Sequence, residues 1–394
     1  MTARWFRAIA AIAVTLSVSG CSTLSYYSQA IGGEFRLLQR RTPISRILEN
    51  PSTPARLRTY LEDVAQIRKF AVRQLGLPDN GSYRDYVHLN RKYVVWVVYA
   101  APGLSLRPRQ WCFPFAGCVA YRGYFARANA LKYATRLHRR GYDTYVAGVT
   151  AYSTLGWLRD PVLSTMLRHG ETAIAETLFH ELAHQKLYIR GDTTFDESFA
   201  VTVSRAGMRR WLNARGNATE WHRYLEQRRR HSQVMALLLR YRARLEALYA
   251  STIPAGRKLQ DKQRVLASLR AAWVRLYRQW GIRDPDIQAA LRRINNAYFV
   301  PIGLYDCDVA AFRTLLASVG GNLPVFYAKA REIGALPAQQ RHRALAALAP
   351  RTHGFCAGRA RQPVVGVAVN GHKRQSAADR APGTADQQAR RRAD

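Results

Sequence analysis

The sequence reads TAIAETLFHELAHQKL over residues 172–187 and FDESFAVTV over residues 195–203. The first stretch has apolar residues at helical spacing and contains no Pro or Gly, which predicts a helix. On that helix His180 and His184 lie on one face, one turn apart. Two imidazoles at this spacing converge on one zinc ion, and Glu181 lies beside them as a base for a metal-bound water.

A catalytic zinc ion usually has three protein ligands and one open position. A Gly-Asp-Thr-Thr turn at residues 191–194 ends the first helix, and Asp196 or Thr194 is expected to cap a second helix that carries Glu197. Because the connecting turn is short, it can bring the first turn of the second helix back against the first helix. We therefore expect one Zn²⁺ with Glu197 as its third ligand, and Asp196 is the competing candidate.

The N-terminus is typical of a targeting segment. Residues 1–7 are basic, residues 8–18 are apolar but too short to span a bilayer stably, and the stretch ends in Val-Ser-Gly-Cys at Cys21. This resembles the bacterial lipobox, which implies a signal peptide over residues 1–20 and a lipid on Cys21. Ser22 favours sorting to the outer membrane. An ordinary cleaved signal and an uncleaved anchor are the alternatives.

The C-terminus differs in composition from the rest of the chain. Residues 357–394 are rich in Arg, Ala, Gln and Gly with few aromatic residues, so we expect a disordered basic tail. One folded domain is expected between these ends, over residues 21–356.

The formal net charge is +35. In a secreted lipoprotein such a charge favours attraction to anionic headgroups or acidic envelope polymers, and not to nucleic acid. The alternative is that the many arginines reflect a high-GC genome and have no function.

Four cysteines remain besides Cys21, an even number that permits disulfides in an oxidising compartment. Cys112 and Cys118 flank a turn-forming Phe-Pro-Phe-Ala-Gly insert, which predicts a disulfide between them. Cys307 and Cys356 pair by elimination, and buried free thiols are the alternative.

The hydrophobic pattern predicts strands before the metal helix and mostly helices after it. The expected strands are residues 93–99 and 143–150, a helix lies between them at 128–140, and a helical hairpin follows at 219–250 and 256–279. The expected fold class is α+β and predominantly helical, with a small mixed β-sheet over the zincin-type helix and a helical C-terminal half. We expect residues 149–155 to form the edge strand that pairs with an extended peptide.

At His180, Glu181, His184 and Glu197 the chain resembles the gluzincins, zinc peptidases whose third ligand is Glu. It resembles more closely a family of predicted aminopeptidase lipoproteins of Gram-negative bacteria. This resemblance covers most of residues 22–350 and is carried by the segments LPDNGSY (77–83), WCFP (111–114), YRGYF (121–125), AYSTLGW (151–157) and DPVLSTM (160–166). Glu197 follows His184 by 13 positions, a shorter connection than in aminopeptidase N-like enzymes, and Asp196 stands where those enzymes often have Asn.

The resemblance implies a peptide substrate and a lipid-anchored zinc aminopeptidase at the periplasmic face of the outer membrane. Glu181 is the expected general base, and a tyrosine usually stabilises the oxyanion in this group. Three tyrosines are candidates for that donor: Tyr152, Tyr188 (in helical register with His184) and Tyr305.

Several acids near the motif have expected or open roles. Glu171, Asp192 and Asp196 are the candidates for holding the substrate amine, and Glu176 is a candidate partner of His180 or a solvated residue. Two other functions stay open: a zinc endopeptidase acting on envelope proteins or peptidoglycan, and a metal-bound scaffold without catalysis.

Overall fold

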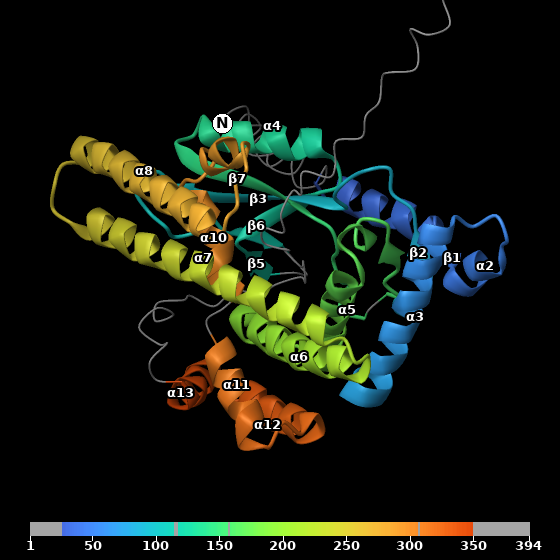
Figure 1. Ribbon diagram of the computed structural model, residues 1–394. Helices are drawn as coiled ribbons and strands as arrows, with labels where there is room; N and C mark the ends of the chain where they lie inside the picture. Colours follow the sequence, from blue (N-terminus) through green and yellow to red (C-terminus); the bar gives the residue numbers. More distant parts are fainter. Residues whose placement is uncertain (1–25, 114–116, 157, 306–307, 350–394) are drawn as a thin grey trace, which may run out of the picture.

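Strand β3 (Val95–Pro102) is the centre of the principal sheet. The computed structural model describes residues 26–113, 117–156, 158–305 and 308–349 (Figure 1). Strands β6 (Tyr121–Tyr124) and β7 (Tyr142–Val149) pair antiparallel with β3 on either side, so that Val97 lies opposite both Gly123 and Ala147. Both faces of β3 are covered, which explains its nearly continuous apolar sequence.

Helix α4 (Arg127–His138) packs on one face of this sheet, where Val98 and Ala100 meet Ala130 and Leu137. The other face, with Val97 and Tyr99, belongs to the main hydrophobic core. The predicted strands at 93–99 and 143–150 and the predicted helix at 128–140 are confirmed with shifts of a few residues.

The remaining strands form two smaller sheets. In the first, β1 (Thr42–Pro43) pairs antiparallel with β2 (Asp85–Val87), which pairs parallel with β8 (Val162–Leu163). In the second, β4 (Trp111–Phe113) and β5 (Gly117–Val119) form a hairpin in which a disulfide joins Cys112 to Cys118. The small mixed sheet of the prediction is present as β1-β2-β8, and the principal sheet β6-β3-β7 is antiparallel.

The prediction of an edge strand over residues 149–155 is wrong, because β7 ends at Val149. Beyond it, side chains take over the hydrogen bonds that a neighbouring strand would make. Thr165 Oγ1 donates to the Thr150 carbonyl, and the Asp160 carboxylate accepts from Ser153 Oγ and the Thr154 amide. Strand β6 is the other edge of this sheet, and the Gln29 amide bonds its outer side at Gly123 O and Phe125 N.

Two helices in the middle of the chain, α5 (Glu171–Lys186) and α6 (Thr193–Ala214), pack against each other and against α3 (Ala55–Leu75). Gly207 on α6 allows the close approach, since a Cβ there would lie 2.7 Å from Leu75 Cδ1 and 2.8 Å from Phe179 Cδ2.

The predicted helical hairpin is confirmed as α7 (Ala218–Ala250) and α8 (Ala255–Gln279), which extend away from the sheet (Figure 1). Buried apolar residues such as Tyr241 and Trp273 hold the two helices together. Lys262 anchors α8 to the sheet by donating to Asp143 Oδ2 at 2.6 Å and to the Gly103 carbonyl at 2.9 Å.

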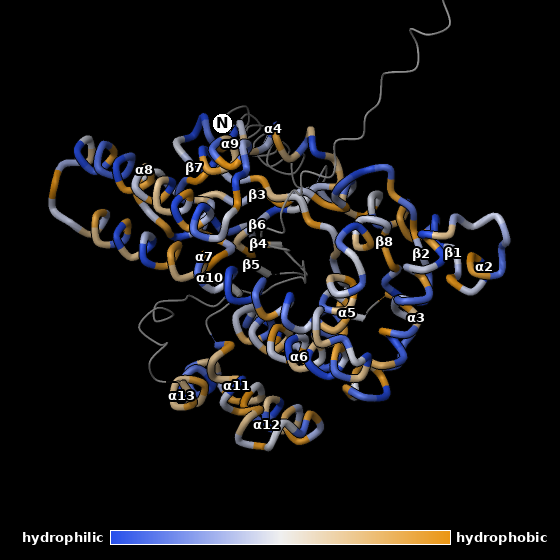
Figure 2. Tube along the Cα trace, in the orientation of Figure 1, coloured by the Kyte–Doolittle hydropathy of each residue, from blue (hydrophilic) through white to orange (hydrophobic). Residues whose placement is uncertain are grey.

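The other helices complete the body. The chain is helical over residues 26–39, and the remaining elements are α2 (Ile44–Glu49), η1 (Leu167–His169), α9 (Ile287–Leu291), η2 (Asn296–Tyr298), α10 (Phe299–Tyr305), α11 (Val309–Ser318), α12 (Leu323–Ala335) and α13 (Ala338–Leu348). Hydrophobic segments of β3 lie inside the body, whereas α7 and α8 alternate hydrophilic and hydrophobic residues (Figure 2). The fold class, predominantly helical α+β, is confirmed. None of the helices in the described ranges combines the length and the apolar character that crossing a membrane requires.

Candidate metal centre

Helix α5 presents the two histidines from the interior of the protein. Its side chains Ile174, Leu178 and Leu182 are fully buried in the main core, which fixes the rotation of the helix. His180 and His184 consequently lie on one face, one turn apart, and their rings meet edge to face with centroids 4.7 Å apart.

The turn between the helices delivers Glu197. Gly191 adopts a left-handed φ of 86°, and Asp192 is the N-cap of α6, with its side chain accepting from the Phe195 amide at 3.1 Å. The prediction that Asp196 or Thr194 caps this helix is therefore wrong. Arg341 Nε donates to Asp192 at 2.7 Å and secures the turn, so that Glu197 enters the core two percent exposed.

The three predicted ligands converge. His180 Nε2 and His184 Nε2 lie 3.1 Å apart, and Glu197 Oε2 lies 3.2 Å from the first nitrogen and 3.7 Å from the second. Ring nitrogens that face each other this closely need a proton or a cation between them. The donor set of two imidazoles and one carboxylate, with ligand atoms within 4.8 Å of one another, fits a zinc ion.

The electrostatics of these residues also favour a cation. Burial lowers the pKa of His180, but the carboxylates of Glu197, Glu181 and Glu176 together outweigh burial and raise the pKa above the ordinary histidine value. Burial acts to raise the pKa of Glu197, yet the imidazoles of His184 and His180 lower it to about 2. Glu197 is therefore ionised and presents a negative charge to the point where the ligands meet.

Glu181 is fully buried next to the ligands. Burial raises its pKa, although the two imidazoles act in the opposite direction. Both of its carboxylate oxygens are buried without a hydrogen-bond partner in the described part of the chain. A carboxylate with a raised pKa and free lone pairs is suited to take and return a proton.

Asp196 does not join the site. Its Oδ1 accepts from the Ile189 amide at 2.7 Å, and burial raises its pKa well above the usual value. The other acids considered for the substrate amine have structural partners: Glu171 pairs with Arg215 at 3.3 Å, and Asp192 pairs with Arg341. Glu176 accepts from the Tyr224 hydroxyl at 3.1 Å, and its charge contributes to raising the pKa of His180.

The three candidate tyrosines differ in their positions. Tyr152 donates its hydroxyl to Glu34. Tyr188 lies beyond the end of α5 at Lys186, so its predicted helical register with His184 is wrong. Tyr305 ends α10, and its side chain is outside the described part of the chain, as are Cys21, Cys307 and Cys356.

A further tyrosine, Tyr83, experiences the charge of Glu181, although no sequence motif singles it out. Tyr83 lies in the LPDNGSY segment, far from the zinc motif in sequence. Burial is the largest cause that raises the pKa of its hydroxyl, and the charge of Glu181 is the second. Nothing in its local sequence marks it as a site residue. The segment's resemblance to the family was the one available signal.

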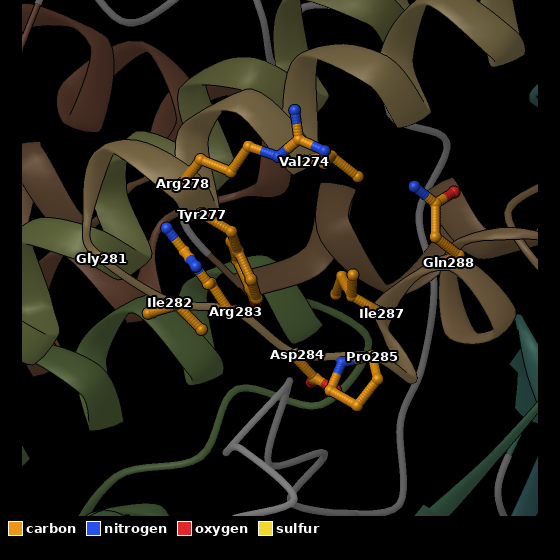
Figure 3. Close-up of a pocket in the computed structure, with 10 residues that line it drawn as sticks. All are labelled: Val274, Tyr277, Arg278, Gly281, Ile282, Arg283, Asp284, Pro285, Ile287 and Gln288. Atoms are coloured by element: carbon orange, nitrogen blue, oxygen red, sulfur yellow. The ribbon is translucent and has the colours of Figure 1, made fainter.

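The structure also contains a pocket that is remote from these residues. It has a volume of about 680 Å³ and lies at the end of α8, where Tyr277, Arg278 and Arg283 surround it (Figure 3). Its lining includes none of the metal-site residues, so it is separate from the metal centre.

Comparison with known proteins bears on the whole domain. No curated protein and no solved structure matches the chain. A match to one protein family, described as "Putative aminopeptidase", covers residues 25–345 and so includes the sheet, α5, α6 and the helical hairpin. The chain therefore belongs to this aminopeptidase family.

Proposed function

We propose that this protein is a zinc-dependent peptidase, most specifically an aminopeptidase. The observation that carries the proposal is the convergence of His180, His184 and Glu197 beside the buried, unpaired carboxylate of Glu181. The ligands would hold one zinc ion through Nε2 of each histidine and a carboxylate oxygen. When bound, zinc supplies Lewis-acid polarisation of the scissile carbonyl and lowers the pKa of a water ligand.

The chain's own residues then have separable tasks. Glu181 accepts the proton of the attacking water and returns it to the leaving amine, and its raised pKa makes it a stronger base for the first transfer. Glu197 and the two histidines stay fixed because the cores of α5 and α6 hold them. The low exposure of Glu181, His184 and Glu197 limits bulk water at the reacting centre.

An aminopeptidase needs a free α-amine on its substrate, whereas an endopeptidase does not. Family membership supports the first activity. Cleavage of a free peptide but not of its N-acetylated form is expected; equal cleavage of both would favour the endopeptidase alternative. A scaffold would bind zinc and cleave neither, and the intact base Glu181 speaks against it.

We further propose that the protein is a lipoprotein of the Gram-negative envelope, anchored through Cys21 and facing the periplasm. The sequence of residues 1–22 supports this proposal. Its test is metabolic labelling with a palmitate analogue, which should label the wild-type protein and not Cys21→Ser.

Positive charge is concentrated on the helical hairpin. Helices α7 and α8 contain fourteen Lys and Arg and four Asp and Glu, and two arginines border the pocket at the end of α8. This supports a salt-dependent attraction of the hairpin to anionic headgroups.

Vesicle binding by the Cys21→Ser protein tests this attraction without the lipid anchor. Binding to phosphatidylglycerol vesicles should weaken when three exposed hairpin arginines, Arg240, Arg275 and Arg278, become Gln. The matched control changes three exposed arginines elsewhere, Arg46, Arg73 and Arg139. Equal loss in both triple variants would show that overall charge, and not the hairpin, causes binding.

A further inference from the structure

Two exposed apolar side chains lie one turn apart on the first helical segment of the described chain, residues 26–39. Ile31 is 66% exposed and Phe35 is 58% exposed, more than any other large apolar side chain in the described ranges. They are four positions apart and therefore share one face of the helix. Single exposed apolar residues are common on protein surfaces, but an adjacent aliphatic and aromatic pair with this exposure points to a partner.

The opposite face of the helix holds this pair in its exposed position. The Gln29 side chain donates to the Gly123 carbonyl and accepts from the Phe125 amide, each at 3.3 Å. Gly33 lies against the ring of Phe125, where a Cβ would be 2.3 Å from Cδ2. Leu37 is three percent exposed and belongs to the main core. Because β6 and the core fix this face, the helix cannot roll to bury the apolar pair.

The exposed surface next to the pair is positively charged. Arg36 and Arg40 are both exposed. Glu34 is the one acid in residues 26–39, and its partly buried carboxylate accepts from the Tyr152 hydroxyl. An apolar pair with exposed arginines beside it complements a surface that is anionic outside and apolar beneath, which describes the headgroup region of an anionic membrane.

The position of the helix along the chain fits the same partner. Cys21 precedes Tyr26, the first described residue, by only five positions. Five residues span at most about 18 Å when fully extended. A lipid on Cys21, as proposed above, therefore keeps the start of this helix within that distance of the headgroups. A peptide or a second copy of the chain has no comparable reason to meet this face.

We propose that Ile31 and Phe35 insert into the headgroup region of an anionic membrane, with Arg36 and Arg40 contacting the phosphates. Residues 26–39 then form a second, noncovalent membrane contact that holds the anchored protein in one orientation. The attraction of the helical hairpin is electrostatic and screened by salt, whereas this contact buries apolar surface and resists salt. The inference goes beyond peptide hydrolysis and does not depend on it.

Vesicle sedimentation of the full-length Cys21→Ser protein in about 0.5 M salt isolates the apolar contact, because salt screens the arginines. Ile31→Ser combined with Phe35→Ser should lower the affinity for phosphatidylglycerol vesicles by about tenfold or more. The matched control combines Leu225→Ser on α7 with Val325→Ser on α12, where the side chains are 43% and 42% exposed, and should bind as the parent does. All four side chains are exposed, so the variants should keep the Tm of the parent.

The arginines are tested at low salt. Arg36→Gln combined with Arg40→Gln should weaken binding to phosphatidylglycerol vesicles but not to phosphatidylcholine vesicles, which carry no net charge. Phe35→Trp keeps an aromatic ring, which favours the membrane interface, and should preserve binding. Equal weakening on both kinds of vesicle, or loss of binding in Phe35→Trp, would contradict the proposed contact.

The serine variants can also overturn the proposal. Equal loss in both double variants would show unspecific apolar adhesion, and no loss in the Ile31 and Phe35 variant would show that this face does not meet the membrane. Gel filtration tests the other occupant: a wild-type dimer that this variant loses, with vesicle binding unchanged, would assign the face to a second copy. None of these measurements uses hydrolysis, so their outcome is independent of the proposed peptidase activity.

Discussion

His180 Nε2 and Glu197 Oε2 lie 3.2 Å apart, although they belong to two different helices and are separated by the turn at Gly191. The Asp192 cap and its bond to Arg341 fix this turn. The short connection of 13 positions between His184 and Glu197 is therefore sufficient to bring the third ligand to the first two.

The third ligand is tested by comparing two adjacent acids. Glu197→Ala should lose zinc, because a carboxylate with a pKa of about 2 supplies the negative charge among the ligands. Asp196→Asn should keep zinc, since its remaining carbonyl oxygen still accepts from the Ile189 amide. Zinc content of purified protein and the zinc-dependent rise in Tm are the measurements. Zinc saturation at about 100 Kd stabilises a fold by about 2.7 kcal/mol, which Glu197→Ala should not show. If Asp196→Asn lost zinc and Glu197→Ala kept it, Asp196 and not Glu197 would be the third ligand.

Attachment of the helical hairpin depends on Lys262. Its ammonium is buried and paired with Asp143. The Oδ2 atom of Asp143 also accepts from the backbone amide of Asn296 at 2.9 Å. Lys262→Met should lower the free energy of unfolding by about 3–5 kcal/mol, because it leaves the carboxylate without its counter-ion. Urea unfolding measures the loss. Arg264→Met, which breaks an exposed i,i+3 pair with Asp261 on the same helix, is the control and should cost about 1 kcal/mol or less. Equal effects would mean that the buried pair does not secure α8.

Glu34 gives a prediction for pH dependence. Burial raises its pKa, while the hydroxyl of Tyr152 lowers it. An acid whose pKa is higher in the folded state contributes stability below its unfolded pKa of about 4.3, and loses it as pH rises through the folded value. Gln does not titrate, so Glu34→Gln should be more stable relative to wild type at pH 8 than at pH 4. Urea unfolding at both pH values measures this, and a difference that is independent of pH would contradict it.

The sequence was sufficient for features that depend on local spacing. The i,i+4 histidines, the apolar periodicity of α5 and the β-branched run of β3 each determine their own local structure. The insert between Cys112 and Cys118 is short enough that its closure is also a local property.

Features that depend on long-range hydrogen bonds were not predictable. Residues 150–155 look like a continuation of β7, but Thr165 binds Thr150 and Asp160 binds Thr154, so that this segment does not pair as a strand. Tyr188 falls outside α5 because the helix ends at Lys186 before the chain turns toward Gly191. The turn at residues 80–83 docks on α5 through bonds of Asn80 and Ser82 to Gln185, a contact across about a hundred positions that no local pattern encodes.

The most direct test of the account measures zinc content and peptide hydrolysis of wild type and Glu181→Gln side by side. We predict about one zinc ion per chain in both proteins, hydrolysis of a free but not an N-acetylated peptide by the wild type, and a rate lower by about 10²–10⁴-fold in Glu181→Gln. Wild-type protein that binds zinc but hydrolyses neither peptide, or Glu181→Gln protein that is as active as the wild type, would contradict it.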